Sequence, residues 1–361
     1  QSGVSMAGSF TMNDLDRTVQ AYTQDATVTA SSVTASAETA DTLITATVGA
    51  SGGRKSTAAV AGSVNLNLVD SDTLAGFLGA SRIMATGDVA SHARDSRTVV
   101  SVAGGGSINT QGKAGIGAAA DVSILNSSVA STIAPAAVVE AGGDVRVTAE
   151  DDHVLVSVAA SLGASKGLGL TGSGSSGTVI TDVRASAGGR VTAGKNLVID
   201  ADDDTLVVSV GGTAAVGVDK VGIGVSVANV NVIRTLAAGI ADGAVVVARG
   251  AGDPVADPSG SVSGNGVLID AHAEEDVFAF AFGGAFSKNA ALQVSPVVTT
   301  VFSDTRAFIG DSASVNADLT GASAAQSVAL RAVHETNLVT ASGALSGSGK
   351  TGIGIAADLA W

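Results

Sequence analysis

The chain has 361 residues, of which 45% are hydrophobic but only 3% aromatic, and it contains 47 Gly, 4 Pro and no Cys. A disulfide framework is therefore excluded. The 33 acidic against 19 basic residues give a net charge of −14, which argues against binding to nucleic acid or anionic lipid. Because small Ala and Val side chains supply the apolar surface, the interior must be thin, with backbones close together. Every long apolar stretch is interrupted by small or polar residues, so we expect no membrane insertion.

A repeat of about 55 residues runs through the chain. In each copy an apolar strand ends in an Ala, here called the anchor, and an acidic segment and a second apolar–small alternation follow. The anchors are Ala37, Ala93, Ala149, Ala201, Ala271 and Ala332, at spacings of 56, 56, 52, 70 and 61 residues. Self-similarity of this kind predicts one stacked array rather than two or three separate domains.

Two further landmarks keep the same register. A Lys follows each anchor by 17 to 20 residues and often begins a Lys-x-Gly-Ile-Gly run; these are Lys55, Lys113, Lys166, Lys220, Lys288 and Lys350. A short strand of small residues then ends at Ala85, Ala141, Ala193, Ala248 and Ala317. The two long spacings come from insertions at the same point of the repeat, 249–266 and 318–327. Insertions confined to one seam predict loops on one face of the array.

The landmarks divide the chain into units. We expect a single array over 1–361 that is cut within a repeat at both ends. Its parts are the tail of a preceding unit at 1–32, the units 33–88, 89–144, 145–196, 197–266 and 267–327, and a truncated unit at 328–361. The unit 145–196 is four residues short, and we expect a local irregularity around 173–189.

The alternation of apolar and small residues at period two, with Gly, Asn and Asp breaks, predicts strands throughout. Because one half-apolar strand cannot bury itself alone, we predict an all-β fold, a repetitive parallel β-solenoid (β-helix) with units of about 55 residues. Four or five strands per unit would make two or three rungs. An alternative is a stack of hairpins, since 206–232 could form a long antiparallel hairpin around 216–220.

The strand after the anchor indicates how the interior is built. Positions seven and nine residues after the anchor are mostly Val or Phe, and the residue between them is Thr, Ser or Ala. We expect stacking to bury the apolar face as a continuous column. Phe278 and Phe280 share this phase, so we interpret the Phe-rich unit, which also holds Phe282, Phe286, Phe302 and Phe308, as core rather than as a partner patch.

Two motifs resemble sites. The run at 344–351 resembles a phosphate-binding loop, but a strand-like Gly-Ile-Gly-Ile follows Lys350 where that loop needs a helix, so we interpret each Lys as marking a strand-connecting turn. Acidic segments follow the anchors, as at 150–152, 202–204 and 274–276, and all four His residues (His92, His153, His272 and His334) lie near them. We interpret these segments as solvated turns, with Ca²⁺ binding as the alternative because Ca²⁺ prefers carboxylate oxygens.

We assign no catalytic, cofactor-binding or metal-binding residue, and we expect the chain not to be an enzyme. Cysteine chemistry is excluded, and repetition of one pattern argues against a single catalytic groove of the kind that carbohydrate-active β-helix enzymes need. The insertion at 249–266 contains a Gly- and Pro-rich turn at 252–260 where a ligand contact could lie.

The repeat unit resembles those of very large bacterial surface and secreted proteins: the filamentous-haemagglutinin-like, two-partner-secreted and autotransporter-type adhesins. The residues that carry the resemblance are clearest at 99–105, 112–117, 131–133 and 137–145. It implies an extracellular, cell-surface β-solenoid stalk or filament for adhesion, biofilm or surface coating, and it brings no active site. The expected partners are neighbouring repeats or like subunits end to end, with host or matrix glycans as further candidates. The alternatives are a carbohydrate-active β-helix enzyme and a calcium-dependent adhesion module.

Overall fold

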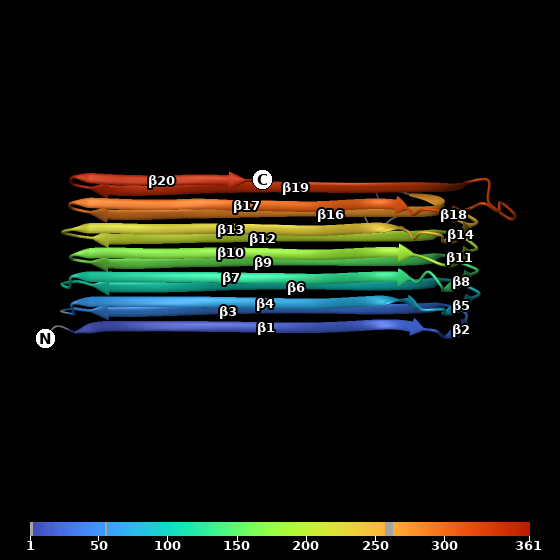
Figure 1. Ribbon diagram of the computed structural model, residues 1–361, viewed down its shortest axis with the longest axis horizontal. Helices are drawn as coiled ribbons and strands as arrows, with labels where there is room; N and C mark the ends of the chain where they lie inside the picture. The colour runs from blue at the N-terminus through green and yellow to red at the C-terminus, as the bar shows by residue number, and fades with distance from the viewer. Residues whose placement is uncertain (1–2, 55, 257–262) are drawn as a thin grey trace.

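The computed structural model describes residues 3–54, 56–256 and 263–361, which form strands and turns (Figure 1). In this part of the chain no helix is long enough and apolar enough to cross a membrane. Each unit contributes two long strands and one short strand, and equivalent strands of successive units stack into three parallel sheets. The all-β parallel solenoid predicted from the repeat is therefore confirmed.

The strands fall into three sets, here called sheets A, B and C. Sheet A contains β1 (Val4–Gln24), β4 (Ala58–Leu78), β7 (Ala114–Ile133), β10 (Leu168–Ala187), β13 (Val221–Ile240), β17 (Ala290–Ile309) and β20 (Thr351–Ala360). Sheet B contains the short strands β2 (Thr27–Ala30), β5 (Arg82–Ala85), β8 (Val138–Ala141), β11 (Arg190–Ala193), β14 (Val245–Ala248) and β18 (Ser314–Val315). Sheet C contains β3 (Val33–Gly53), β6 (Val89–Asn109), β9 (Val145–Ser165), β12 (Leu197–Gly217), β16 (Ser263–Ser287) and β19 (Gln326–Ser348).

Each repeat makes one rung, so the expectation of two or three rungs per unit was wrong. All six anchors lie side by side in sheet C, where Ala37 pairs with Ala93, Ala93 with Ala149, and so on to Ala332. The reason is the length of the strands: β6, β9 and β12 each run for 21 residues without a break. The acidic segments expected to be turns lie inside these strands and do not end them.

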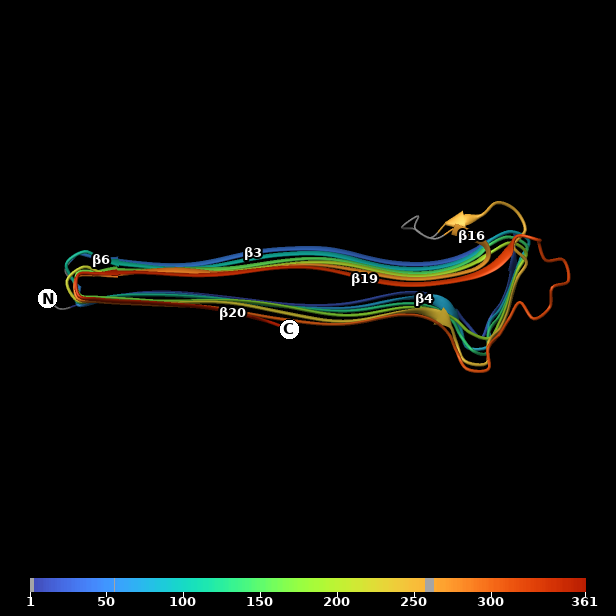
Figure 2. The same ribbon diagram turned by 90° about the horizontal axis from the view of Figure 1, so that it is seen from above.

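The two long strands of a unit do not form a hairpin, and the stacked-hairpin alternative is wrong. β12 pairs only with β9 and β16 in sheet C, whereas β13 pairs with β10 and β17 in sheet A. The connection at 218–220 is therefore an arch: a turn whose flanking strands face each other across the interior (Figure 2). The predicted role of the Lys residues as markers of these turns is confirmed for the exposed residues Lys113, Lys166, Lys220, Lys288 and Lys350, and Lys55 lies outside the described residues.

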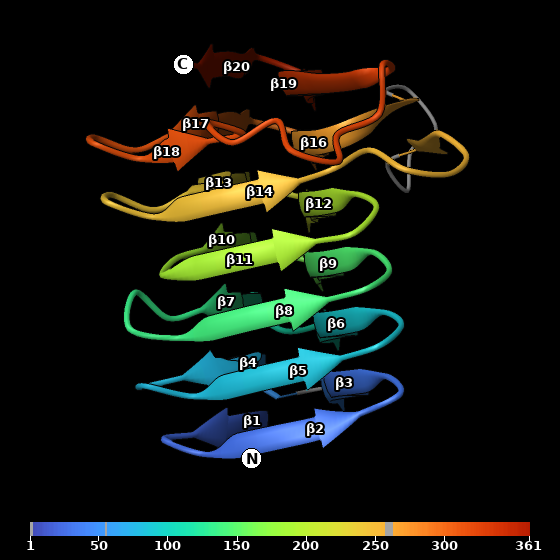
Figure 3. The same cartoon turned by 90° about the vertical axis from the view of Figure 1, so that its right-hand side faces the viewer.

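The described parts of the two insertions lie together at the corner between sheets B and C, as the single seam predicted (Figure 3). The guanidinium of Arg249 donates a hydrogen bond to the carbonyl oxygen of Thr320 at 2.6 Å, and Ser323 donates its N–H to the carbonyl oxygen of Arg249 at 2.8 Å. The first insertion also contains β15 (Val255–Ala256), which pairs antiparallel with the start of β16. Of the turn at 252–260, residues 257–260 lie outside the described residues.

The unit 145–196 loses its four residues in two turns rather than within 173–189 as a whole. Its arch has two residues between β9 and β10, where the preceding unit has four between β6 and β7. The turn between β10 and β11 likewise has two residues, where the preceding turn has four. β10 itself keeps full register with β7 from Leu168 to Ala187. Length changes are therefore absorbed where no ladder hydrogen bond depends on them.

Along the strands the molecule divides into two halves of opposite polarity. The base half lies next to sheet B and includes the anchors; its interior is a continuous apolar core with residues such as Ile83, Val139 and Ile199, each fully buried. The arch half runs from about seven residues after the anchor to the arch, and its interior consists mainly of Gly, Ser, Thr and Ala. Most of its Val, Ile and Phe side chains lie on the outer faces, whereas Val297 of sheet A is buried inside.

The expectation that the Val and Phe side chains seven and nine residues after the anchor are buried was therefore wrong. Ser101, Ser157 and Ser209 are the buried residues, and their Val and Phe neighbours point outward; Ile44 is 73% exposed and Phe302 59%. The cause is the close approach of sheets A and C near the arch. A Cβ atom on Gly117 would overlap the carbonyl oxygen of Leu162, and one on Gly105 would overlap that of Ala118. The Gly residues of the Lys-x-Gly-Ile-Gly run must face inward, so the Ile between them faces out. The predicted thin interior is confirmed.

Candidate functional site

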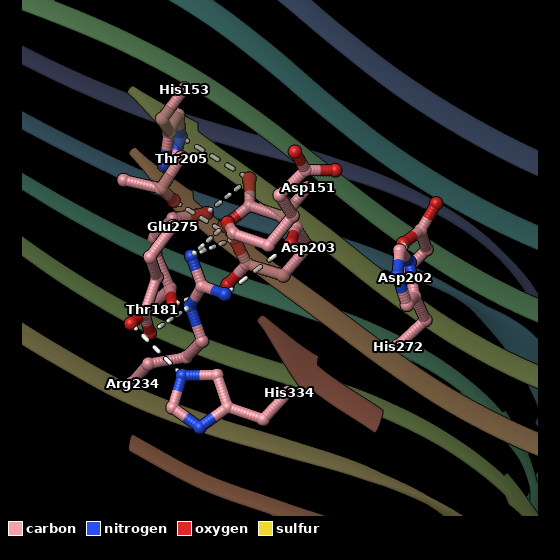
Figure 4. A network of polar contacts seen from close by, with 12 residues as sticks. Asp151, His153, Thr181, Asp202, Asp203, Thr205, Arg234, His272, Glu275 and His334 are labelled. Atoms are coloured by element: carbon pink, nitrogen blue, oxygen red, sulfur yellow. Dashed lines mark hydrogen bonds and ion pairs between the residues drawn. The ribbon is translucent and has the colours of Figure 1, made fainter. Parts of the chain in front are cut away.

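A buried ladder of charged side chains lies inside the solenoid where the base half meets the arch half (Figure 4). It is built at the positions two and four residues after the anchor, which face inward from sheet C, and at one inward position of sheet A. Its central members are almost fully buried: Asp95, Arg97, Asp151, His153, Asp203, Arg234 and Glu275. We call this set the ionic ladder.

At one end of the ladder Arg97 holds both oxygens of Asp95. The guanidinium contacts Asp95 Oδ2 at 2.8 Å and donates from Nε to Oδ1 at 3.0 Å, and both side chains are fully buried. The Ser127 hydroxyl, from sheet A, lies 3.1 Å from Asp95 Oδ2 and 3.3 Å from Asp151 Oδ1. Burial raises the pKa of Asp95, and the positive charge of Arg97 opposes this rise.

The next rung carries Asp151 and His153 on the same strand. His153 Nε2 lies 3.2 Å from Asp151 Oδ1, and neither side chain is exposed. Burial, together with the charges of Arg97 and Arg234, lowers the pKa of His153 to about 3, so the imidazole is neutral at ordinary pH. Burial first, and then repulsion from Asp203 and Asp95, raises the pKa of Asp151 well above its ordinary value. Both shifts favour the uncharged form of this pair.

Arg234 connects the following two rungs from the opposite sheet. Its guanidinium lies 3.1 Å from Asp203 Oδ1 and 3.3 Å from Glu275 Oε1, and it also donates to the carbonyl oxygens of Asp203 and Glu274. Thr181 and Thr205 donate their hydroxyls to the two oxygens of Asp203 at 2.6 and 2.9 Å. Glu275 Oε2 contacts His334 Nε2 at 3.0 Å. The ladder thus couples at least four rungs.

A second, smaller polar cluster lies inside the arch half. The carboxylate of Asp121 accepts hydrogen bonds from the hydroxyls of Ser101 and Ser157, one on each neighbouring rung of the facing sheet. Asn67 donates to Ser101 at 2.8 Å and to Ser123 at 3.0 Å. Burial raises the pKa of Asp121, and the two Ser hydroxyls oppose this rise. The interior of the arch half is therefore held by side-chain hydrogen bonds as well as by backbone ladders.

The interpretation of the acidic segments as solvated turns was wrong. In the segment 150–152, Asp151 faces inward and is 3% exposed, while Glu150 and Asp152 face outward from the same strand. Strict alternation continues through β9, so three consecutive acids do not break it. Only the outward carboxylates are available to solvent, and the inward ones form the ionic ladder.

The donor set of the ladder is poorly suited to a metal ion. Ligand atoms of Asp95, Asp151 and His153 lie within 4.8 Å of one another. Both oxygens of Asp95 are engaged by Arg97, however, and the charges of Arg97 and Arg234 already act on His153. Two guanidinium groups oppose a further cation at this point. The central side chains of the ladder are at most 3% exposed, so we assign the ladder a role within the fold.

Ca²⁺ at the acidic segments, the alternative from the sequence, can concern only the outward carboxylates. Asp152, Asp204 and Glu274 stack on consecutive rungs of sheet C. Burial and the neighbouring charges of Glu274 and Asp152 raise the pKa of Asp204, as expected for stacked like charges. These carboxylates are exposed or half-buried on the outer face of the sheet, whereas the ladder carboxylates lie inside it.

The four His residues do not meet at one place. His92 contacts Thr148 at 2.7 Å and His272 contacts Asp202 at 3.1 Å on the outer face of sheet C. His153 and His334 face the interior. The run at 344–351 lies at the end of β19, in the arch and at the start of β20, as expected for a strand connection and not for a phosphate-binding loop.

Sequence reasoning missed the two ladder arginines. A signal existed for Arg234, because it is a charged residue in an inward phase of a strand whose neighbours at that phase, Val232 and Leu236, are buried and apolar. No pattern in the sequence pairs it with Asp203 or Glu275, which lie 31 and 41 residues away. Comparisons with protein-family models, with curated proteins and with solved structures found no match to this chain.

Proposed function

We propose that this chain is a structural segment of a bacterial cell-surface protein: a rigid, non-catalytic β-solenoid that extends by end-to-end stacking of like units. The single observation that carries the proposal is the register of the units. Strands such as β9 and β12 pair residue by residue over their whole length, and the same holds from one unit to the next. One unit is therefore a template for the next.

The two ends of the stack support this role. β1 and β3 lie at one end of sheets A and C, and β20 and β19 lie at the other (Figure 1). The outer edges of these strands present backbone N–H and C=O groups to which a further rung can add. Inward-facing apolar residues of the first rung, such as Leu15 and Val19, would be covered by such an addition.

An edge-blocking substitution tests the proposal. Val19→Lys places a charge where an added rung would bury it, which should reduce end-to-end association. We expect elongated particles of the wild-type chain in electron micrographs and a rising mass in light scattering, both lost in V19K. Gln20→Lys, an outward change on the same strand, is the matched control. Association that is equal in both variants, or its absence in the wild-type chain, would contradict the proposal.

The two alternatives have separate tests. A carbohydrate-active enzyme should release products from a panel of glycans, and product release abolished by one acidic substitution would replace our proposal. A calcium-dependent adhesion module should lose thermal stability in EDTA. The column Asp152, Asp204 and Glu274 is where bridging ions would sit, so Asp204→Asn should then remove the effect of Ca²⁺.

A further inference from the structure

The outer face of sheet C in the arch half is a broad apolar surface. It consists of the outward residues seven to fifteen positions after each anchor, here called the apolar band. Representative members are Val100, Val156, Val208, Phe278 and Val339 in one column. Phe282 is 49% exposed, Phe286 41% and Leu345 63%. The opposite face of each strand is occupied by the small interior residues, so among the described residues these side chains contact neighbours on the same face, as the stacked rings of Phe280 and Phe282 do.

The apolar band has the size of a protein interface. Nine residues at ~3.3 Å and six rungs at ~4.8 Å give a surface on the order of 900 Å². Soluble monomers rarely expose a contiguous apolar patch beyond roughly 600 Å², and a stable interface buries about 800 Å² per partner. The band is also uneven: Phe282 lies between Gly212 and Gly343, and Leu345 lies beside Gly284, which leaves a shallow hollow among them.

Charged residues lie on both sides of the apolar band along the strand direction. Outward acids lie one to three residues after the anchor, including Glu150, Asp152, Asp202, Asp204 and Glu274. In the five arches whose Lys is described, from Lys113 to Lys350, this exposed Lys lies 17 to 20 residues after the anchor. The band runs from seven to fifteen, so acids and lysines are nearly equidistant from a line about ten residues after the anchor. A two-fold rotation about that line, parallel to the stacking direction, would place the lysines of one copy over the acids of the other.

We propose that the occupant of the apolar band is a second copy of this chain, packed face to face with its strands antiparallel. The two arch halves then overlap, and the two acidic base halves project to opposite sides. In this arrangement Lys220 of one copy lies beside Asp202 and Asp204 of the same rung in the other. Sheets packed in this way are ~10 Å apart, the ordinary spacing of stacked sheets. This interface is lateral, and it adds to the end-to-end stacking proposed above without depending on it.

Zero-length cross-linking with a carbodiimide tests the arrangement. Within one copy, Lys220 and Asp204 are separated by sixteen residues of continuous chain, or ~50 Å in extended strands, so a cross-link between them must join two copies. End-to-end stacking aligns Lys with Lys and acid with acid and cannot form it. We expect cross-links from Lys220 or Lys288 to Asp202, Asp204 or Glu274 by mass spectrometry. Lys166 and Asp219, 3.9 Å apart within the chain, are the internal positive control.

A pair of variants on the same unit provides the second measurement. Val210→Glu places a charge near the middle of the band, whereas Val227→Glu makes the same change on the outer face of sheet A. Both residues are half-buried on outer faces, so both variants should fold. We expect V210E to lose the Lys–acid cross-links and to halve the mass of the edge-blocked V19K protein in sedimentation equilibrium. V227E should change neither.

Three outcomes would overturn the inference. The first is the absence of Lys–acid cross-links while the Lys166–Asp219 control link forms. The second is an equal loss of cross-links in V210E and V227E, which would assign the interface to no single face. The third is a monomeric edge-blocked protein that instead floats with phosphatidylcholine vesicles, which would make lipid the occupant of the band. Loss of end-to-end fibres in V19K, with the cross-links retained, affects only the proposed function.

Discussion

The base half and the arch half of the same strands have opposite polarity. In the base half Ile199 and Val147 lie inside and carboxylates such as Asp202 lie outside. In the arch half Ser209 lies inside and Val208 and Val210 lie outside. Because the strands are continuous, this inversion occurs without a break or a bulge. It shows that the distance between the two sheets, and not hydrophobicity, decides which residues are buried near the arch.

The ionic ladder marks the boundary between the halves, and breaking it should have the largest effect. Arg234→Met would leave Asp203 and Glu275 buried without their counter-charge, which should lower the free energy of unfolding by ~3–5 kcal/mol. Arg184→Met is the control, since Arg184 forms an exposed pair with Asp182 at 2.7 Å, and it should cost less than ~1 kcal/mol. Denaturant unfolding measures both, and equal losses would remove the ladder as a stabilising feature.

The second largest effect should come from truncating an inward side chain of the base half, compared with an outward side chain of the arch half. Ile199→Ala, in the base half, creates a cavity in the apolar core and should cost ~2–5 kcal/mol. Val208→Ala also truncates an apolar side chain to Ala on the same strand, but on the outer face. It should lower the free energy of unfolding by less than ~1 kcal/mol. Denaturation midpoints of the two variants test the inversion. A greater loss for V208A would mean that the Val face is buried after all.

Overpacking of the arch half should follow. Gly117→Ala adds a Cβ that overlaps the carbonyl oxygen of Leu162, which should destabilise the chain by ~1–3 kcal/mol. Gly172→Ala makes the same change on the outer face, where a Cβ meets no atom within 4 Å, and it should be neutral or slightly stabilising. If the two variants have the same melting temperature, the sheets are not in contact near the arch.

The smallest effect at neutral pH is expected for His153→Gln, and it should grow as the pH falls. The pKa of His153 is about 3 in the folded chain, against 6.5 for the free side chain, so the unfolded chain binds the extra proton between these values. His153 therefore costs the folded state stability as the pH falls from 6.5 towards 3. The raised pKa values of Asp95, Asp151 and Asp203 act in the opposite direction.

Comparison with the variant isolates the His153 contribution. The stability of H153Q relative to the wild-type chain should increase steadily from pH 7 to pH 4 in denaturant titrations. A difference that is independent of pH would show that the pKa of the imidazole is the same in the folded and unfolded chain, as for a side chain that reaches solvent.

The sequence was sufficient to predict a parallel solenoid built from a repeat of about 55 residues, because the anchor Ala residues, the arch lysines and the single insertion seam recur at similar offsets. It did not show which face of each strand points into the interior. Period-two alternation separates two faces but does not say which is inside, and the Val-rich face was the natural choice. The Gly residues of the Lys-x-Gly-Ile-Gly run indicate the inward face, since a residue without a Cβ is needed there because the two backbones approach closely.

The ionic ladder could be predicted only in part. The inward acid of each triplet follows from continuous alternation through segments such as 147–158. The pair of Arg97 with Asp95 is also local, because the two residues face inward from the same strand two positions apart. The partners of Arg234 do not follow from the sequence, because Arg234 lies on the opposite sheet. Its distances to Asp203 and Glu275 depend on how the arches bring sheets A and C together, which no local pattern records.

The stacking of one rung per repeat determines the mechanical character of the molecule. A repeat advances the stack by only ~4.8 Å but is ~70 Å wide, so a stack of 100 Å requires roughly twenty repeats, or more than a thousand residues. Such a stack has a flat, wide cross-section rather than a round one. Its resistance to bending scales with the square of the depth in the bending plane. With a width of ~70 Å and a thickness of ~20 Å including side chains, it should bend roughly ten times more easily across its sheets than within their plane.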